Sequence, residues 1–86
     1  MSAEAPNPVR EAILELTALR GAGKTICPTE AAKAVSPENF VRVLKDVRAE
    51  AIRLRKAGTI AIYRKGKPVE DPDRFKGVYR LGLPTS

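Results

Sequence analysis

The stretch SPENFVRVLKDVRAEAIRLRKAGTIAIYRKGK, residues 36–67, contains the change of periodicity that decides the fold. It begins with a serine, a proline and an acid, which together are typical of the start of a helix. Apolar residues then recur at helical spacing until Gly58, and glycine is the preferred residue just past a helix end. From Thr59 onward the residues are rich in β-branched and aromatic types. The stretch therefore predicts a helix over 37–57 followed by a strand over 59–64.

A helix, a short extended piece and a second helix are expected before this stretch. Asn7 and Pro8 are typical of an N-cap and a first helical position. Apolar residues recur at helical spacing from there until Gly21 ends the helix. Residues 24–26 are expected to be extended, and Pro28 then opens a short second helix.

A β-hairpin is expected after the long helix. Residues 65–68 contain a glycine and a proline and are predicted to turn the chain, and the polar segment 69–76 leads to a returning strand over 77–81. Two helices joined by a short turn and followed by a hairpin form a winged helix-turn-helix. The sequence thus predicts an α+β fold with three helices and a small antiparallel sheet, in the order α-β-α-α-β-β.

Length and composition limit the chemistry that the chain can perform. The 86 residues are expected to form one winged-helix domain over 7–83, with a flexible tail over 1–6 and a short tail over 84–86. A chain of this size builds one modest core and has little room for a deep cleft. It contains no histidine and only one cysteine, which excludes histidine acid–base catalysis, Cys–His pairs and the common zinc patterns. We therefore expect no enzyme, no catalytic residue, no metal site and no cofactor.

The single cysteine and the hydropathy pattern favour a cytoplasmic protein. One cysteine cannot form an internal disulfide, and Cys27 is expected to be a small buried residue rather than a reactive thiol. No apolar run approaches the roughly 20 residues of a membrane span, and the N-terminus lacks the layout of a signal peptide. We expect no membrane contact.

Residues 21–25, GAGKT, look like the end of a phosphate-binding loop. That motif requires a glycine at position 18, where the chain has Ala18, and a strand before the loop, where a helix is expected. The chain is also too short for the sheet and crossover helices that surround such a loop. We therefore expect no bound nucleotide.

The positive charge is concentrated in one segment. Of the net charge of +6, residues 42–67 contribute +7, from nine Lys/Arg against two acids, while residues 1–41 contribute −1 and residues 68–86 are neutral. Such a concentration indicates a polyanionic partner.

The long helix is expected to have an apolar face and a basic face. At 100° per residue its apolar residues form one stripe, a typical core face, and four cations lie around Ala49 on the far side. Arg48 and Arg55 lie on the flank, where their stems are expected to cover apolar surface. Arginine and lysine can bind guanine and asparagine can bind adenine in a major groove. The expected nucleic-acid-binding residues are Asn39, Arg42, Lys45, Ala49, Arg53 and Lys56 on the helix and Arg64, Lys65 and Lys67 on the hairpin.

Acidic residues near the basic face and in the hairpin loop are the evidence against nucleic-acid binding. Asp46 and Glu50 adjoin the basic face and oppose binding of a polyanion. Glu70, Asp71 and Asp73 could suggest a metal or acid–base site, but no further ligand accompanies them and Asp-Pro-Asp is common in turns.

Two functional hypotheses follow. The first is a protein that binds double-stranded DNA, such as a transcriptional regulator, with helix 37–57 as the recognition helix and hairpin 59–82 as the wing. The alternative is a winged-helix module for protein–protein interaction that does not touch nucleic acid. The sequence leaves open the DNA target, the oligomeric state and any role of Cys27.

Two groups of residues resemble the signatures of a family of small bacterial proteins classed as a domain of unknown function. The front signature is GKTICPTE at 23–30, continued by the alanine pair at 31–32 and Ser-Pro at 36–37. The rear signature is RKGKPV at 64–69, followed by Asp-Pro at 71–72, FKG at 75–77 and YRL at 79–81. One departure is Phe40-Val41-Arg42, where many members have a tryptophan before the arginine. The resemblance covers roughly residues 9–83 and implies a winged-helix fold and a bacterial origin, but no activity.

Overall fold

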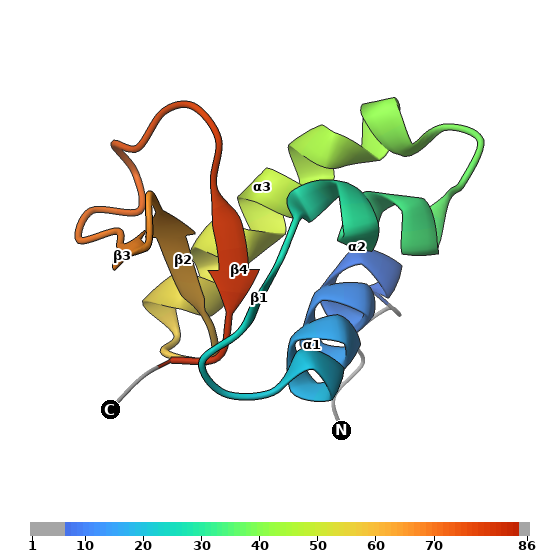
Figure 1. Cartoon of the computed structure of the whole chain (residues 1–86). Helices are drawn as coiled ribbons and strands as arrows, with labels where there is room; N and C mark the ends of the chain where they lie inside the picture. The colour runs from blue at the N-terminus through green and yellow to red at the C-terminus, as the bar shows by residue number, and fades with distance from the viewer. Residues whose placement is uncertain (1–6, 85–86) are drawn as a thin grey trace, which may run out of the picture.

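The computed structural model describes residues 7–84, and in this part of the chain three helices pack together, two of them against a small antiparallel sheet (Figure 1). The helices are α1 (Pro8–Arg20), α2 (Pro28–Val35) and α3 (Phe40–Lys56), and the strands are β1 (Thr25–Ile26), β2 (Ala61–Arg64), β3 (Lys67–Pro68) and β4 (Arg80–Gly82). The predicted α+β class and the predicted order of its elements are confirmed. The tail expected over 1–6 and residues 85–86 of the C-terminal tail lie outside the described residues.

The strand order is β1-β4-β2-β3, so the last strand of the chain lies inside the sheet. Leu81 of β4 pairs with Ile26 of β1 on one side and with Ile62 of β2 on the other. All three side chains are fully buried. Because neighbouring residues of a strand point to opposite faces, this row defines the face of the sheet that meets the helices.

The first helix begins and ends as its sequence predicts. Asn7 Oδ1 accepts a hydrogen bond from the Arg10 N–H at 3.0 Å, and Pro8 occupies the first turn. At the other end Gly21 has a φ of 88°, and its N–H donates to the Thr17 carbonyl at 3.0 Å. A positive φ at this position favours glycine over any residue with a Cβ.

The start of α3 differs from the predicted start at residue 37. The expected capping hydrogen bond is present, because the Asn39 N–H donates to Ser36 Oγ at 3.3 Å. However, Ser36 is extended and ends α2, and the residues between it and Phe40 form a bend instead of a helical turn. The serine therefore closes the connection between two helices, and α3 begins only at Phe40 and ends at Lys56.

The hairpin is shorter and tighter than the predicted turn over 65–68. Lys65 and Gly66 both have a positive φ, of 52° and 80°. Two such residues form the mirror-image turn that matches the twist of an antiparallel pair. Lys67 and Pro68 therefore pair with β2 as the strand β3, which the sequence did not predict. The returning strand β4 begins at Arg80, three residues later than the predicted start at 77.

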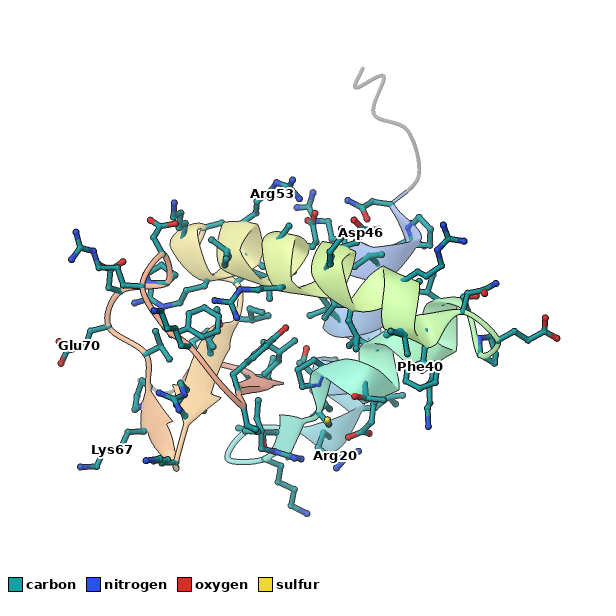
Figure 2. All side chains as sticks on the ribbon, turned by 90° about the horizontal axis from the view of Figure 1, so that it is seen from above. Arg20, Phe40, Asp46, Arg53, Lys67 and Glu70 are labelled. Atoms are coloured by element: carbon teal, nitrogen blue, oxygen red, sulfur yellow. The ribbon has the colours of Figure 1, made fainter. Side chains whose placement is uncertain are left out.

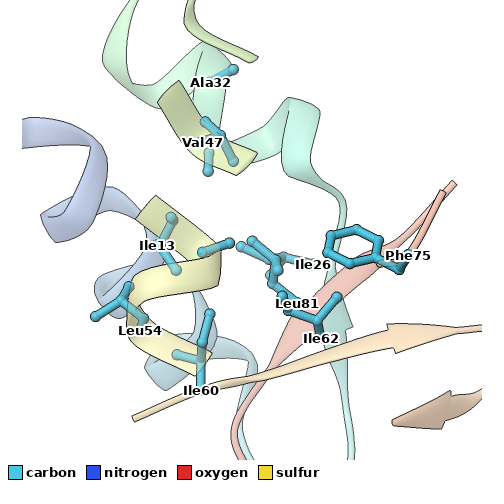
Figure 3. Close-up of a cluster of buried hydrophobic side chains, with 11 residues drawn as sticks. Ile13, Ile26, Ala32, Val47, Leu54, Ile60, Ile62, Phe75 and Leu81 are labelled. Atoms are coloured by element: carbon cyan, nitrogen blue, oxygen red, sulfur yellow. The ribbon is translucent and has the colours of Figure 1, made fainter. Parts of the chain in front are cut away.

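The core lies between the sheet and the three helices (Figure 3). Ile13 of α1, Val47 and Leu54 of α3 and the Ile26–Leu81–Ile62 row are each at most 2 % exposed. Phe75, from the loop between β3 and β4, is also buried and joins the same cluster. Within residues 7–84 no helix has the length and apolarity needed to span a bilayer.

Candidate nucleic-acid interface

The basic face of α3 lies on the surface, as its periodicity predicts. The side opposite the core carries exposed residues at the five predicted positions, which are Arg42, Lys45, Ala49, Arg53 and Lys56. We call these five residues the helix surface. The small side chain of Ala49 stands among the four cations and leaves the backbone accessible there.

Two of the four cations on the helix surface are engaged in ion pairs. Arg53 Nη1 lies 2.5 Å from Glu50 Oε1, and Lys56 Nζ lies 3.0 Å from Asp73 Oδ2. Among residues 7–84, no carboxylate oxygen lies within 4 Å of the Arg42 or Lys45 head group. The charge available to a polyanion is therefore concentrated at the N-terminal half of α3.

Glu50 is buried and tied to the start of α1. Its Oε1 accepts a hydrogen bond from Asn7 Nδ2 at 3.2 Å in addition to the bond from Arg53. Its charge is therefore largely satisfied inside the protein. Asp46, which the sequence places beside the basic face, is exposed there (Figure 2).

The remaining predicted site residues are divided between the helix start and the hairpin. Asn39 is the exposed N-cap of α3, and its side chain makes no capping hydrogen bond. Arg64 Nε donates to the Val78 carbonyl at 3.1 Å, so this arginine also fastens the hairpin. Lys65 and Lys67 are exposed at and beside the turn.

The structure does not bring all nine predicted residues onto one surface. In Figure 2, Arg53 projects from the outer side of α3, whereas Lys67 lies on the opposite side of the molecule. The helix surface and the hairpin tip therefore face different directions. Nucleic-acid contact by either of them stays a prediction.

A set of contacts between α3 and the loop over 69–79 was not predicted. Arg48 Nη2 donates to the Phe75 carbonyl at 2.6 Å, and its guanidinium lies 4.0 Å from the centre of the Phe75 ring. Arg55 Nη2 donates to the Val69 carbonyl at 3.4 Å. The two flanking arginines thus hold the loop on α3, beyond the expected packing of their stems. One residue in the sequence could have indicated that the loop packs on the domain, since Phe75 is a large apolar residue in a polar loop.

The acidic residues of the same loop serve the turn. Asp71 Oδ1 accepts a hydrogen bond from the Asp73 N–H at 3.0 Å, which is the turn chemistry predicted for Asp-Pro-Asp. Asp73 also pairs with Lys56, as described above.

Cys27 is half-buried, not fully buried as expected, and lies at the N-cap of α2. Its N–H donates to Glu30 Oε2 at 2.9 Å. The other oxygen of Glu30 accepts from Arg20 at 2.6 Å, which links the end of α1 to the start of α2.

Tyr79 is expected to make the fold sensitive to alkali. Burial raises the pKa of its hydroxyl above the ordinary value of 10.0, Arg48 opposes this rise, and Cys27 adds to it. Because the folded state holds this proton more tightly than the unfolded chain, the stability from the neutral phenol is complete below pH 10.0 and is lost as the pH rises through the folded pKa. The loss of unfolding free energy between about pH 8 and pH 11 should be smaller in Tyr79→Phe than in the parent protein.

The matching measurement is an absorbance titration of Tyr63→Phe, in which Tyr79 is the only tyrosine left. The expected midpoint lies above 10.0. A midpoint at or below that value would contradict the prediction.

The geometry defines a small basic α+β domain with an exposed cationic helix. The chain belongs to the family described as "Protein of unknown function (DUF3253)", whose model matches residues 6–84. The expected membership of a family of unknown function is thereby confirmed, while its signature residues and a bacterial origin stay predictions. None of the curated proteins compared with the chain matches it.

Proposed function

We propose that this domain is a winged helix that binds double-stranded DNA through α3, as a transcriptional regulator does, and that it has no catalytic activity. The order of three helices and a terminal hairpin supports this assignment. The observation that carries it is the pair Arg42 and Lys45, which are exposed beside Ala49 and have no carboxylate partner among the described residues.

The loop over 69–79 leaves the relevant part of α3 accessible. Its fastening points on the helix are Arg48, Arg55 and Lys56, which lie on one flank and toward the C-terminal end. In helix-turn-helix proteins the N-terminal residues of the recognition helix reach the base edges. In this mode Arg42 and Lys45 bind base edges or the nearest phosphates, and Arg53 and Lys56 exchange their carboxylates for phosphate oxygens further along the groove.

The test is a titration of a fluorescently labelled duplex at two salt concentrations. Affinity should fall steeply between about 50 mM and 200 mM salt, because phosphate contacts release counterions. The double variant Arg42→Ala/Lys45→Ala should lose about 1–3 kcal/mol of binding free energy for each contact that reads a base.

The charge-matched control is Arg10→Ala/Lys33→Ala, which removes two exposed cations from α1 and α2. It should retain most of the affinity. The proposal fails if the parent protein does not bind at about 50 mM salt, or if both double variants lose the same affinity.

A protein-binding module is the second candidate, and one observation favours it. A largely apolar groove of about 560 Å³ lies between α2, α3 and the end of the loop, with Leu44, Val78 and Tyr79 in its lining. Val78 is 84 % exposed, so its apolar surface is available to a partner at the mouth of this groove. This module would retain its partner in Arg42→Ala, because Arg42 does not line the groove, and would lose it in Val78→Asp.

A further inference from the structure

A second basic surface lies on the face of the sheet that no described helix covers. A groove of about 610 Å³ is lined there by Lys24, Thr25, Tyr63, Arg64, Lys65 and Arg80, among other residues. Tyr63 and Arg80 are directly paired across β2 and β4, next to the buried Ile62–Leu81 pair. Because side chains alternate along a strand, Tyr63 and Arg80 point to the face of the sheet opposite the buried Ile62–Leu81 pair, away from the core.

The charges of this groove are uncompensated. It is lined by four cations and by no carboxylate. Within residues 7–84, the acids that form ion pairs bind Arg20, Arg53, Lys56 and Arg74, none of which lines the groove. In this respect the groove differs from the helix surface, where two of four cations are already paired.

Two of the cations are held in place before any ligand binds. Arg80 Nε donates to Thr25 Oγ1 at 2.6 Å, and its Nη2 donates to the Thr25 carbonyl at 3.2 Å. Arg64 Nε donates to the Val78 carbonyl at 3.1 Å. All of these partners are neutral, so the bonds fix the guanidinium groups without cancelling their charge.

Tyr63 is fixed against the sheet beside these cations. Its hydroxyl donates to the Leu83 carbonyl at 3.0 Å, and its ring lies over Gly82. A Cβ at Gly82 would stand only 2.8 Å from the Lys24 carbonyl oxygen and 3.3 Å from Tyr63 Cε2, so glycine lets the backbone at Lys24 and the ring both approach β4 closely. The half-buried ring is therefore an immobilised aromatic surface surrounded by positive charge.

We propose that this groove binds a segment of single-stranded nucleic acid. An unpaired base stacks on Tyr63, while the flanking phosphates contact Lys24, Lys65 and Arg80. Proteins that bind single strands combine aromatic side chains for stacking with cations that follow the backbone. A duplex does not fit this mode, since its bases are already stacked and paired. The proposal goes beyond duplex binding by α3 and does not depend on it, because the two surfaces share no residue.

The first experiment uses tyrosine fluorescence. The chain has two tyrosines and no tryptophan, so Tyr63 is the only fluorescent residue of this kind in Tyr79→Phe. An oligothymidylate of about twelve nucleotides should quench this emission, because a base stacks on the ring. An abasic phosphodiester of the same length should cause no quenching and should bind about tenfold more weakly.

The second experiment measures the anisotropy of the labelled oligothymidylate with the full chain. Tyr63→Leu should weaken binding about tenfold, whereas Tyr63→Phe, which keeps the ring, should bind as the parent protein does. Lys24→Ala/Lys65→Ala should also weaken binding and reduce its salt dependence. Arg10→Ala/Lys33→Ala, which removes two exposed cations outside both surfaces, is the charge-matched control and should leave it unchanged. Circular dichroism confirms that each variant is folded.

Three results would overturn the proposal. The first is that the abasic strand binds as tightly as the oligothymidylate. The second is that Lys24→Ala/Lys65→Ala binds the oligothymidylate as tightly as the parent protein does. The third is that Tyr63→Leu weakens duplex binding as much as single-strand binding. If the parent protein binds the single strand but not the duplex, the proposed role of α3 is contradicted and the proposed role of the groove is supported.

Discussion

Replacing Leu81 with alanine is expected to lower the free energy of unfolding by about 2–5 kcal/mol, the usual cost of truncating a fully buried leucine. Leu81 is 0 % exposed and pairs with Ile26 of β1 and Ile62 of β2 at once. Its loss leaves a cavity at the point where the sheet meets the helices. Because a domain of this size has a total stability of about 5–15 kcal/mol, the variant should be partly unfolded or close to it. Urea unfolding followed by circular dichroism measures the change.

The control is Val78→Ala in the preceding loop, which removes two methyl groups from a side chain that is 84 % exposed. Its unfolding free energy should stay within about 0.5 kcal/mol of the parent value. Equal losses in the two variants would show that the Ile26–Leu81–Ile62 row does not hold the core together.

Replacing Arg48 with alanine is expected to release the loop over 69–79 and to cost about 2–3 kcal/mol, because a part-buried charged hydrogen bond and two contacts with aromatic rings are lost together. The guanidinium donates to the Phe75 carbonyl at 2.6 Å and lies 4.0 Å and 5.7 Å from the Phe75 and Tyr79 ring centres. Amide hydrogen exchange in the loop should become faster. The free-energy change calculated from this increase in rate should equal or exceed the loss of unfolding free energy.

The control for this variant is Arg74→Ala, which removes an arginine from the loop itself. The Arg74 side chain is 85 % exposed and forms only a 3.6 Å contact with Asp71. It should change stability by less than about 0.5 kcal/mol. If Arg48→Ala leaves loop exchange unchanged, the loop is held by Phe75 burial and not by the arginine.

The elements that the sequence predicts well depend on neighbours in the chain. The N-cap Asn7, the proline after it and the terminal Gly21 act within a few residues of one another, so α1 is found with its ends. The start of α3 is predicted three residues early, because Ser36 forms the expected bond to the Asn39 N–H while the chain still bends. The strand β3 is missed, because pairing of Lys67 with Arg64 depends on the left-handed conformation of Lys65, which composition does not reveal.

In the candidate site, too, local features are predictable from the sequence and contacts between distant residues are not. Helical periodicity alone places Arg42, Lys45 and Ala49 on the exposed side of α3. The pairing of Glu50 with Asn7 joins residues 43 positions apart, and no local pattern contains it. The groove on the sheet likewise brings together Lys24, just before β1, and Arg80 of β4, which are distant in sequence. It became visible only once the register of β1, β4 and β2 was known.

Because β4 lies between β1 and β2, the sheet cannot form until residues 80–82 have left the ribosome. Ile26 cannot pair until Leu81 has been synthesised, which is 55 residues later, the difference of their positions. During the several seconds of synthesis that separate them, the apolar sides of α1 and α3 have no sheet to cover them. The full sheet is therefore expected to assemble only once residues 80–82 have emerged from the ribosome. A nascent chain interrupted before residue 80 would expose the apolar faces of its helices, which chaperones and proteases bind.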